Sequence, residues 1–106
     1  MRAQVSEGLS LADGAKSAMW DFYTDTGRLP SSNTSAGLAS ATSIAGNYVT
    51  SVEISSGIVV VTYGNEANAR LQDQTLQLSA ATTGGSITWS CTGGTLVSRY
   101  RPASCR

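Results

Sequence analysis

Residues 48–63 read YVTSVEISSGIVVVTY, and this stretch decides the fold class. In its first half, Val52 and Ile54 alternate with Ser51 and Glu53. Alternation of apolar and polar side chains with a period of two is typical of a β-strand with one buried face. The chain therefore contains sheet structure from about residue 48.

A turn and a second strand complete this stretch. Ser55-Ser56-Gly57 reverses the chain into the Ile/Val-rich run 58–63, so we expect two strands joined by a short glycine turn, which is a hairpin. The unbroken Ile/Val run predicts a central strand that is covered on both faces over part of its length.

Two further strands are expected after a polar connection. Apolar side chains occupy alternate positions in 76–80 and again in 87–91, and residues 82–86 supply a glycine-containing turn between them. Four successive strands joined in this way predict an antiparallel β-meander over residues 47–91.

Ahead of the sheet, residues 2–23 contain no proline and show a helical period. The apolar positions on one stripe are Val5, Leu9, Ala12, Met19 and Tyr23. The polar positions on the opposite side are Glu7, Ser10, Asp13, Ser17 and Asp21. This pattern predicts an amphipathic helix whose polar side faces solvent.

The helix needs a packing partner. Gly8 and Gly14 each weaken it by up to about 1 kcal/mol relative to alanine, and isolated helices of this length are marginal in water. Lys16 lies within the apolar stripe, where its alkyl stem covers apolar surface while the ammonium reaches solvent. We therefore expect the helix to pack on the sheet, which gives an α+β fold.

The core is expected where helix and sheet meet. We predict that Met19 of the helix, Val60 of the Ile/Val run and Leu78 of the third strand contact one another there.

Residues 24–46 are predicted to form a connecting loop with one helical turn near Leu38, because Gly27, Pro30 and many small polar residues exclude a long regular element. A loop of this length is either a tolerated insertion or a surface segment with its own role. Asn33-Thr34-Ser35 also matches a glycosylation sequon, although a short motif of this kind decides nothing.

The two cysteines allow two interpretations. A disulfide between Cys91 and Cys105 closes a 15-residue ring, worth about 3 kcal/mol in the chain-entropy model, and holds a terminal loop with little apolar material. It places the domain outside the cytosol. The alternative is two free thiols in a cytosolic protein.

Composition excludes several chemistries. The 106 residues include seven basic and seven acidic side chains and no histidine, which suits one domain without imidazole-based catalysis or metal binding. Two cysteines are too few for a four-thiolate zinc site. Asp13, Asp21 and Asp25 are explained by a solvated helix face and a turn, so we expect no enzyme, metal or cofactor.

The sequence has no apolar run long enough to span a membrane and no signal peptide. It starts with a helical pattern already in progress. We therefore expect the native protein to be longer than this chain.

Five segments in order give the chain a family resemblance. They are RAQVSEGLSLADGAK (2–16), GNYV (46–49), ARLQDQTLQL (69–78), ITWSC (87–91) and YRPASC (100–105). Together they resemble the globular domain of type IV pilins of the type IVa class, without the first half of the long N-terminal helix. The resemblance covers nearly the whole chain as one domain.

The resemblance implies a structural subunit of a surface fibre used for adhesion, twitching motility or DNA uptake. It implies that Cys91 and Cys105 close the C-terminal loop 91–105, and that loops 24–46 and 92–104 are variable surface. Family members are cleaved and methylated prepilins anchored in the inner membrane by the missing helix, which then packs in the filament. The implied partners are copies of the subunit and the assembly machinery, with a host surface or DNA as further candidates, and the present fragment is expected to be soluble.

Two alternatives stay open. One is a minor pilin or a secretion-system pseudopilin with the same fold. The other is a DNA-binding pilin that uses Arg99, Tyr100, Arg101 and Arg106, because residues 74–106 carry three arginines and no acid. The competing explanation pairs these arginines with the acidic half of the same or a neighbouring subunit.

Overall fold

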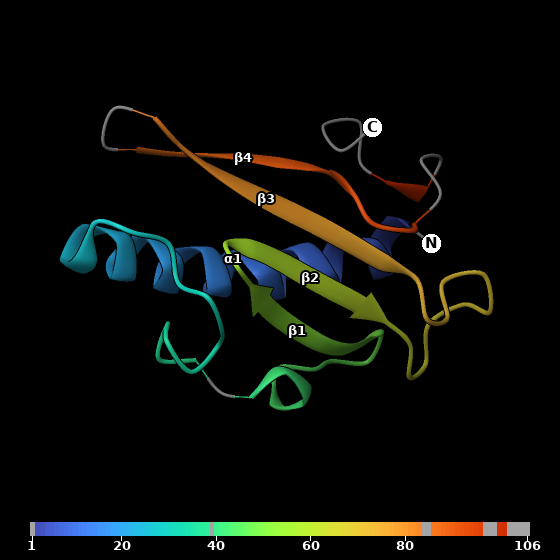
Figure 1. Ribbon diagram of the computed structural model, residues 1–106. Helices are drawn as coiled ribbons and strands as arrows, with labels where there is room; N and C mark the ends of the chain where they lie inside the picture. The colour runs from blue at the N-terminus through green and yellow to red at the C-terminus, as the bar shows by residue number, and fades with distance from the viewer. Residues whose placement is uncertain (1, 39, 84–85, 97–99, 102–106) are drawn as a thin grey trace.

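One helix lies across one face of a four-stranded sheet in the computed structural model, which describes residues 2–38, 40–83, 86–96 and 100–101 (Figure 1). The helix is α1 (Arg2–Thr26). The strands are β1 (Val49–Ser55), β2 (Ile58–Tyr63), β3 (Thr75–Thr83) and β4 (Ser86–Gly93). They pair antiparallel in the order β1-β2-β3-β4, which confirms the α+β meander.

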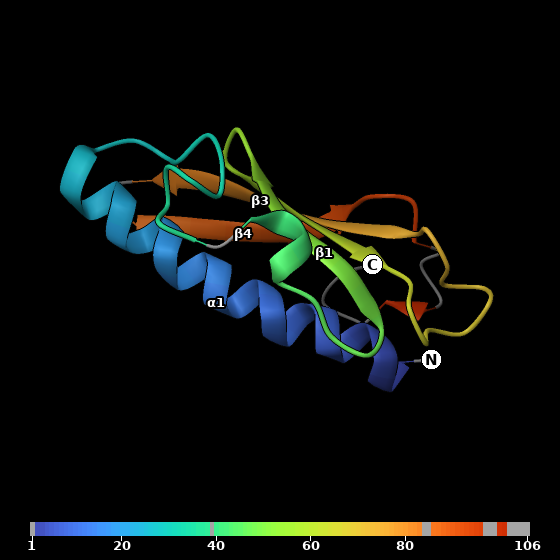
Figure 2. The same ribbon diagram turned by 90° about the horizontal axis from the view of Figure 1, so that it is seen from below.

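Helix and sheet form two layers, as Figure 2 shows from below. The helix contacts β1 and β2 most extensively. Its buried side chains are Val5, Ala12, Ala15 and Met19. Leu9 and Tyr23 of the expected stripe are only half-buried, so the contact line is centred on Ala12 and Met19.

The helix ends three residues later than predicted. Gly27 has φ +76°, and its N–H donates to the carbonyl of Tyr23 at 2.8 Å. A glycine in the left-handed conformation is a common helix terminator. The residues between Tyr23 and Gly27 contain no such breaker, so the helix continues through them.

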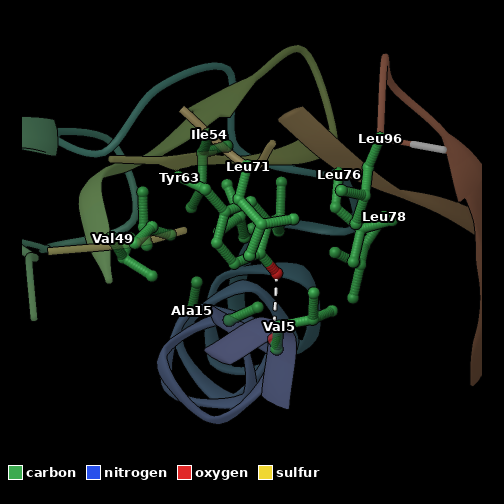
Figure 3. Close-up of a cluster of buried hydrophobic side chains, with 14 of the residues drawn as sticks. Val5, Ala15, Val49, Ile54, Tyr63, Leu71, Leu76, Leu78 and Leu96 are labelled. Atoms are coloured by element: carbon green, nitrogen blue, oxygen red, sulfur yellow. Dashed lines mark hydrogen bonds between the residues drawn. The ribbon is translucent and has the colours of Figure 1, made fainter. Parts of the chain in front are cut away.

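At Gly8, α1 approaches the sheet closely. The ring of Tyr63, at the end of β2, lies over it, and the Tyr63 hydroxyl donates to the Val5 carbonyl at 2.9 Å (Figure 3). A Cβ at Gly8 would lie 2.8 Å from Tyr63 Cε1. Burial first, and the nearby Glu7 charge second, raise the pKa of Tyr63, so the phenol stays neutral and keeps its proton for Val5. The glycine that weakens the helix locally is required by this contact.

The two helix glycines should therefore respond oppositely to alanine. Gly8→Ala forces the Tyr63 ring to move, and overpacking of this kind costs about 1 to 3 kcal/mol. A Cβ at Gly14 would meet nothing within 4 Å, so Gly14→Ala should stabilise by up to about 1 kcal/mol through helix propensity. Chemical denaturation of both variants measures the difference, and stabilisation by Gly8→Ala would contradict the Tyr63 contact.

The β1–β2 hairpin turns at Ser56 and Gly57, whose φ angles are +49° and +82°. Two central residues with positive φ are typical of a type I′ turn, which matches the twist of the flanking strands. Ser55 then pairs with Ile58. The predicted hairpin is confirmed.

The prediction that Val60 belongs to the core is wrong. Val60 pairs with Glu53 and Gln77 on the sheet face away from α1, where it is half-buried. Met19 and Leu78 are buried as predicted. Because side chains alternate along β2 and α1 covers only one face, the run of β-branched residues is divided between the faces.

The inner face of the sheet and the connection 64–74 complete the core. The buried side chains from these parts are Val49, Val52, Ile54, Val59, Val61, Tyr63, Ala67, Leu71, Leu76 and Leu78. Figure 3 shows Leu71, Leu76 and Leu78 around Tyr63 above the helix. Leu96, after β4, joins them.

The long connection between α1 and β1 contains a short 3-10 helix, η1 (Ala41–Ser43). A separate hydrogen-bonded turn lies over residues 33–37, where the Leu38 N–H donates to the Asn33 carbonyl at 2.8 Å, as predicted for a turn near Leu38. Within the described residues, no helix is both long and apolar enough to cross a membrane.

Candidate functional site

The described ranges hold no pocket and no group of three or more histidine, cysteine, aspartate or glutamate side chains able to bind a metal. Polar side chains in these ranges instead connect loops to the helix and sheet. The candidate functional features are therefore the molecular surface and the side-chain contacts that hold the loops in place.

Asn33 fastens the α1–β1 connection to the edge strand β1. Its Nδ2 donates to the Val52 carbonyl at 3.0 Å, and its Oδ1 accepts the Ile54 N–H at 2.6 Å. The side-chain amide thereby takes the place of a neighbouring strand at this edge. The carbonyls of Pro30 and Ser31 also accept N–H groups of the β1–β2 turn.

This role changes the interpretation of the Asn33-Thr34-Ser35 motif. Asn33 is only 7% exposed and its amide is engaged with β1, so the folded chain does not present it as a glycan acceptor. The sequence carried no signal for the contact, because the partners lie 19 and 21 residues away.

Glu7 is a second residue whose role the sequence did not indicate. The helical period predicts it on the solvated side, yet it is half-buried and binds the two residues that precede β1. Its Oε1 accepts the Asn47 N–H at 3.0 Å and its Oε2 accepts the Tyr48 N–H at 2.8 Å. A Cβ at Gly46 would lie 2.8 Å from Glu7 Cδ, so the adjacent glycine makes room for the carboxylate.

Arg101, one of the candidate DNA contacts, is 5% exposed. Its Nε donates to the Leu96 carbonyl at 2.8 Å and its Nη2 donates to the Gly94 carbonyl at 3.1 Å. Leu96 in turn donates its N–H to the Thr75 carbonyl at 2.9 Å. The guanidinium thus holds the segment after β4 against the start of β3 and does not face solvent.

Tyr100 is also buried, and its hydroxyl accepts a hydrogen bond from Arg70 Nη1 at 3.2 Å. The hydrogen bond to Tyr100 raises the pKa of the exposed Arg70. Neither Tyr100 nor Arg101 forms an exposed stacking or phosphate-binding surface in this conformation. Arg99 and Arg106 lie outside the described residues, so a contact by them stays a prediction.

Cys91 lies half-buried on β4, on the same face as Trp89. Cys105 lies outside the described residues. The disulfide that closes residues 91–105 therefore stays a prediction.

The three aspartates considered for acid–base chemistry are exposed, as expected for a solvated face. Asp13 pairs with Lys16 at 3.5 Å. Asp21 and Asp25 follow along α1. No pocket lies beside them in the described part of the chain.

Comparison with known proteins gives a consistent result. A family model described as "Pilin (bacterial filament)" matches residues 1–106. A fimbrial protein of Neisseria meningitidis serogroup A is 46% identical over 91 residues, which is 85% of this chain and 54% of that protein. The type IV major pilin protein PilE of Neisseria gonorrhoeae is 44% identical over 91 residues, with the same shares of the two chains.

A third relative extends the comparison. The fimbrial protein EcpC of Eikenella corrodens is 36% identical over 110 aligned residues, which cover 99% of this chain and 70% of that protein. The chain spans about half the length of the two Neisseria relatives.

Proposed function

Because the chain belongs to the pilin family of bacterial filament proteins, we propose that it is the globular part of a structural subunit of a type IV pilus. The observation that carries the proposal is the family match over residues 1–106, together with relatives named as type IV major pilins. The helix packs on a four-stranded meander, and Asn33 and Arg101 hold the loops before β1 and after β4 in place. A rigid domain of this kind suits a subunit of a fibre.

The finer parts of the proposal concern the whole protein. We infer one domain over residues 1–106, a fibre outside the cell, and inner-membrane anchoring before assembly. Its partners are copies of itself and the pilus assembly machinery, and the fibre that it builds serves adhesion, twitching motility or DNA uptake. The burial of Arg101 and Tyr100 speaks against the C-terminal arginines as a DNA site.

Imaging of fibres tests this function. The full-length gene, expressed in a strain lacking its own pilin, should restore surface filaments, and mass spectrometry of sheared filaments should find this chain as the main component. Expression of the protein to normal levels without filaments would contradict a major structural role. Filaments that contain it only in trace amounts would favour the minor-pilin alternative.

We also propose that Cys91 and Cys105 form the disulfide that closes the C-terminal loop. The ring of 15 residues is expected to contribute about 3 kcal/mol, so reductant should lower the melting temperature while the helix and sheet stay folded. Intact-mass analysis after alkylation should find no free thiol in the native protein. Two alkylated cysteines before reduction would exclude the pairing.

A further inference from the structure

The sheet has two outer strands, β1 and β4, and their free edges differ (Figure 1). Along β1, the Asn33 amide binds the backbone of Val52 and Ile54, as described above. Among the described residues, no side chain or loop makes a corresponding hydrogen bond to the backbone of Ile87 or Trp89 on β4. In the described part of the chain, β4 therefore presents an open edge at these two residues.

The backbone of β4 directs polar groups toward this open edge. Ala80, which pairs with Trp89, donates its N–H to the Gly57 carbonyl at 3.2 Å, on the β2 side of β3. Opposed residues in an antiparallel pair alternate between those that exchange hydrogen bonds and those that do not. The Ala80–Trp89 pair is of the second kind, so the N–H and C=O of Trp89 point away from β3. Ile87, two positions earlier on the strand, has the same orientation.

The sequence of β4 supplies none of the usual protection for such an edge. Native proteins blunt edge strands with charged side chains or proline, and Ser86–Gly93 contain neither. Isoleucine, threonine and tryptophan, which occupy positions 87–89, are residues that favour strand pairing. The edge is therefore suited to accept a further strand through main-chain hydrogen bonds, the mode of recognition called β-augmentation.

A second copy of β4 fits this edge in one antiparallel register. A two-fold axis at Thr88 places Ile87 of each chain opposite Trp89 of the other. Both residues direct N–H and C=O outward, so each of the two Ile87–Trp89 pairs exchanges two hydrogen bonds. The paired side chains then lie next to each other on one face of the sheet, and an aromatic beside a β-branched side chain is a favourable cross-strand pair.

Charge also permits two identical edges to meet. Like charges directly opposite each other destabilise strand pairing, and Ser86–Gly93 carry no charge. Lys16 of α1, whose Nζ lies 5.4 Å from the ring centre of Trp89, is paired with Asp13 at 3.5 Å. Its charge is thus offset within its own chain.

We propose that the β4 edge at Ile87 and Trp89 is a strand-pairing site for β4 of a second copy of this chain. The contact joins the same surface of both chains and closes on itself. It is therefore distinct from the repeating contact that extends a fibre, and it does not rest on the proposed function. The paired segment is short, so we expect the association to be weak and to require a high concentration of the chain.

Hydrogen exchange tests the pairing at the residues that form it. When the chain is raised from micromolar to millimolar concentration, exchange of the Ile87 and Trp89 amides should slow several-fold. The Ile54 amide, which Asn33 holds at the β1 edge, is the control and should exchange at one rate throughout. Exchange of Ile87 and Trp89 that does not depend on concentration would overturn the proposal. Protection of both at every concentration would mean that another segment of the same chain covers the edge.

Charge substitutions at Thr88 test the register. Thr88 is exposed and, in the proposed pair, lies opposite its own copy. Thr88→Lys and Thr88→Glu should each reduce the millimolar chain to the monomer mass in sedimentation equilibrium, because like charges then oppose each other. An equimolar mixture of the two variants should restore the dimer. Ser55→Lys, an exposed change on the other edge strand, is the matched control and should dimerise like the wild type. Dimers of Thr88→Lys alone would overturn the proposal.

The folded state of these variants is measured separately. Thr88 Oγ1 donates to the Ala81 carbonyl at 3.2 Å, so both Thr88 variants lose one exposed hydrogen bond, and their melting temperatures at low concentration report its cost. If these variants unfold, Ile87→Pro takes their place, because it removes an outward N–H and leaves the hydrogen bonds to β3 intact. It should abolish the concentration dependence of Trp89 exchange. Persistence of that dependence in Ile87→Pro would contradict the pairing.

Discussion

Replacing Met19 with alanine should lower the free energy of unfolding by about 2 to 5 kcal/mol. Met19 is fully buried between α1 and the sheet, so truncation removes apolar contacts and leaves a cavity. For a domain of this size, each kcal/mol shifts the melting temperature by roughly 4 to 8 °C. Thermal or urea unfolding followed by circular dichroism measures the loss.

Two matched variants make the Met19 test specific. Asp21→Ala changes an exposed residue two positions away and should stay within about 0.5 kcal/mol of wild type. Val60→Ala should cost less than Met19→Ala, because Val60 is half-buried on the uncovered face of the sheet. Equal losses for Met19→Ala and Asp21→Ala would mean that the helix is rotated relative to the arrangement described above.

Asn33→Ala is expected to be the other strongly destabilising change. It removes the partners of two buried backbone groups, the Ile54 N–H and the Val52 carbonyl, and each unsatisfied group costs about 1 to 3 kcal/mol. The loop 27–48 should also lose its attachment to β1. Hydrogen exchange of the Ile54 amide, measured beside global stability, should show the local loss.

Thr34→Ala is the control for Asn33, since Thr34 is exposed and adjacent in the sequence. It should change stability by less than about 0.5 kcal/mol. If Asn33→Ala were equally mild and left Ile54 protected, the amide would not hold the loop to the edge strand. The long loop would then be the tolerated insertion that the sequence left open.

Asn33 and Trp20 lie on different parts of the molecule. Asn33 protects the β1 edge of the sheet, where an uncovered strand could pair with another chain. Trp20 lies on the helix and is accessible. The β1 edge is therefore kept out of strand pairing with another chain.

Periodicity along the chain was enough to predict the element types and their order. A period of 3.6 over α1 and a period of two over the strands are local properties, and the turn at Ser56 and Gly57 depends on residues next to one another. The helix end was misplaced by three residues, because its terminator is Gly27 and the polar residues before it tolerate helix.

Residues whose partners are distant in the sequence depended on the tertiary structure. Periodicity states that side chains along β2 alternate, but the position of α1 decides that Val59 and Val61 are buried while Val60 is not. Glu7 binds backbone groups 40 and 41 residues away, so no local pattern distinguishes it from its solvated neighbours on the helix.

Charge alone made Arg101 a candidate for a DNA contact or for pairing with acidic side chains, whereas the fold buries it against the carbonyls of Gly94 and Leu96. A long arginine side chain can satisfy free carbonyls in a segment without regular structure, and only the path of that segment shows which carbonyls are within reach. The sequence by itself thus determined the helix, the strands and the family resemblance. The tertiary structure decided which polar side chains hold the loops and which large apolar side chains, such as Trp20, remain accessible. Both outcomes depend on distances between remote parts of the chain.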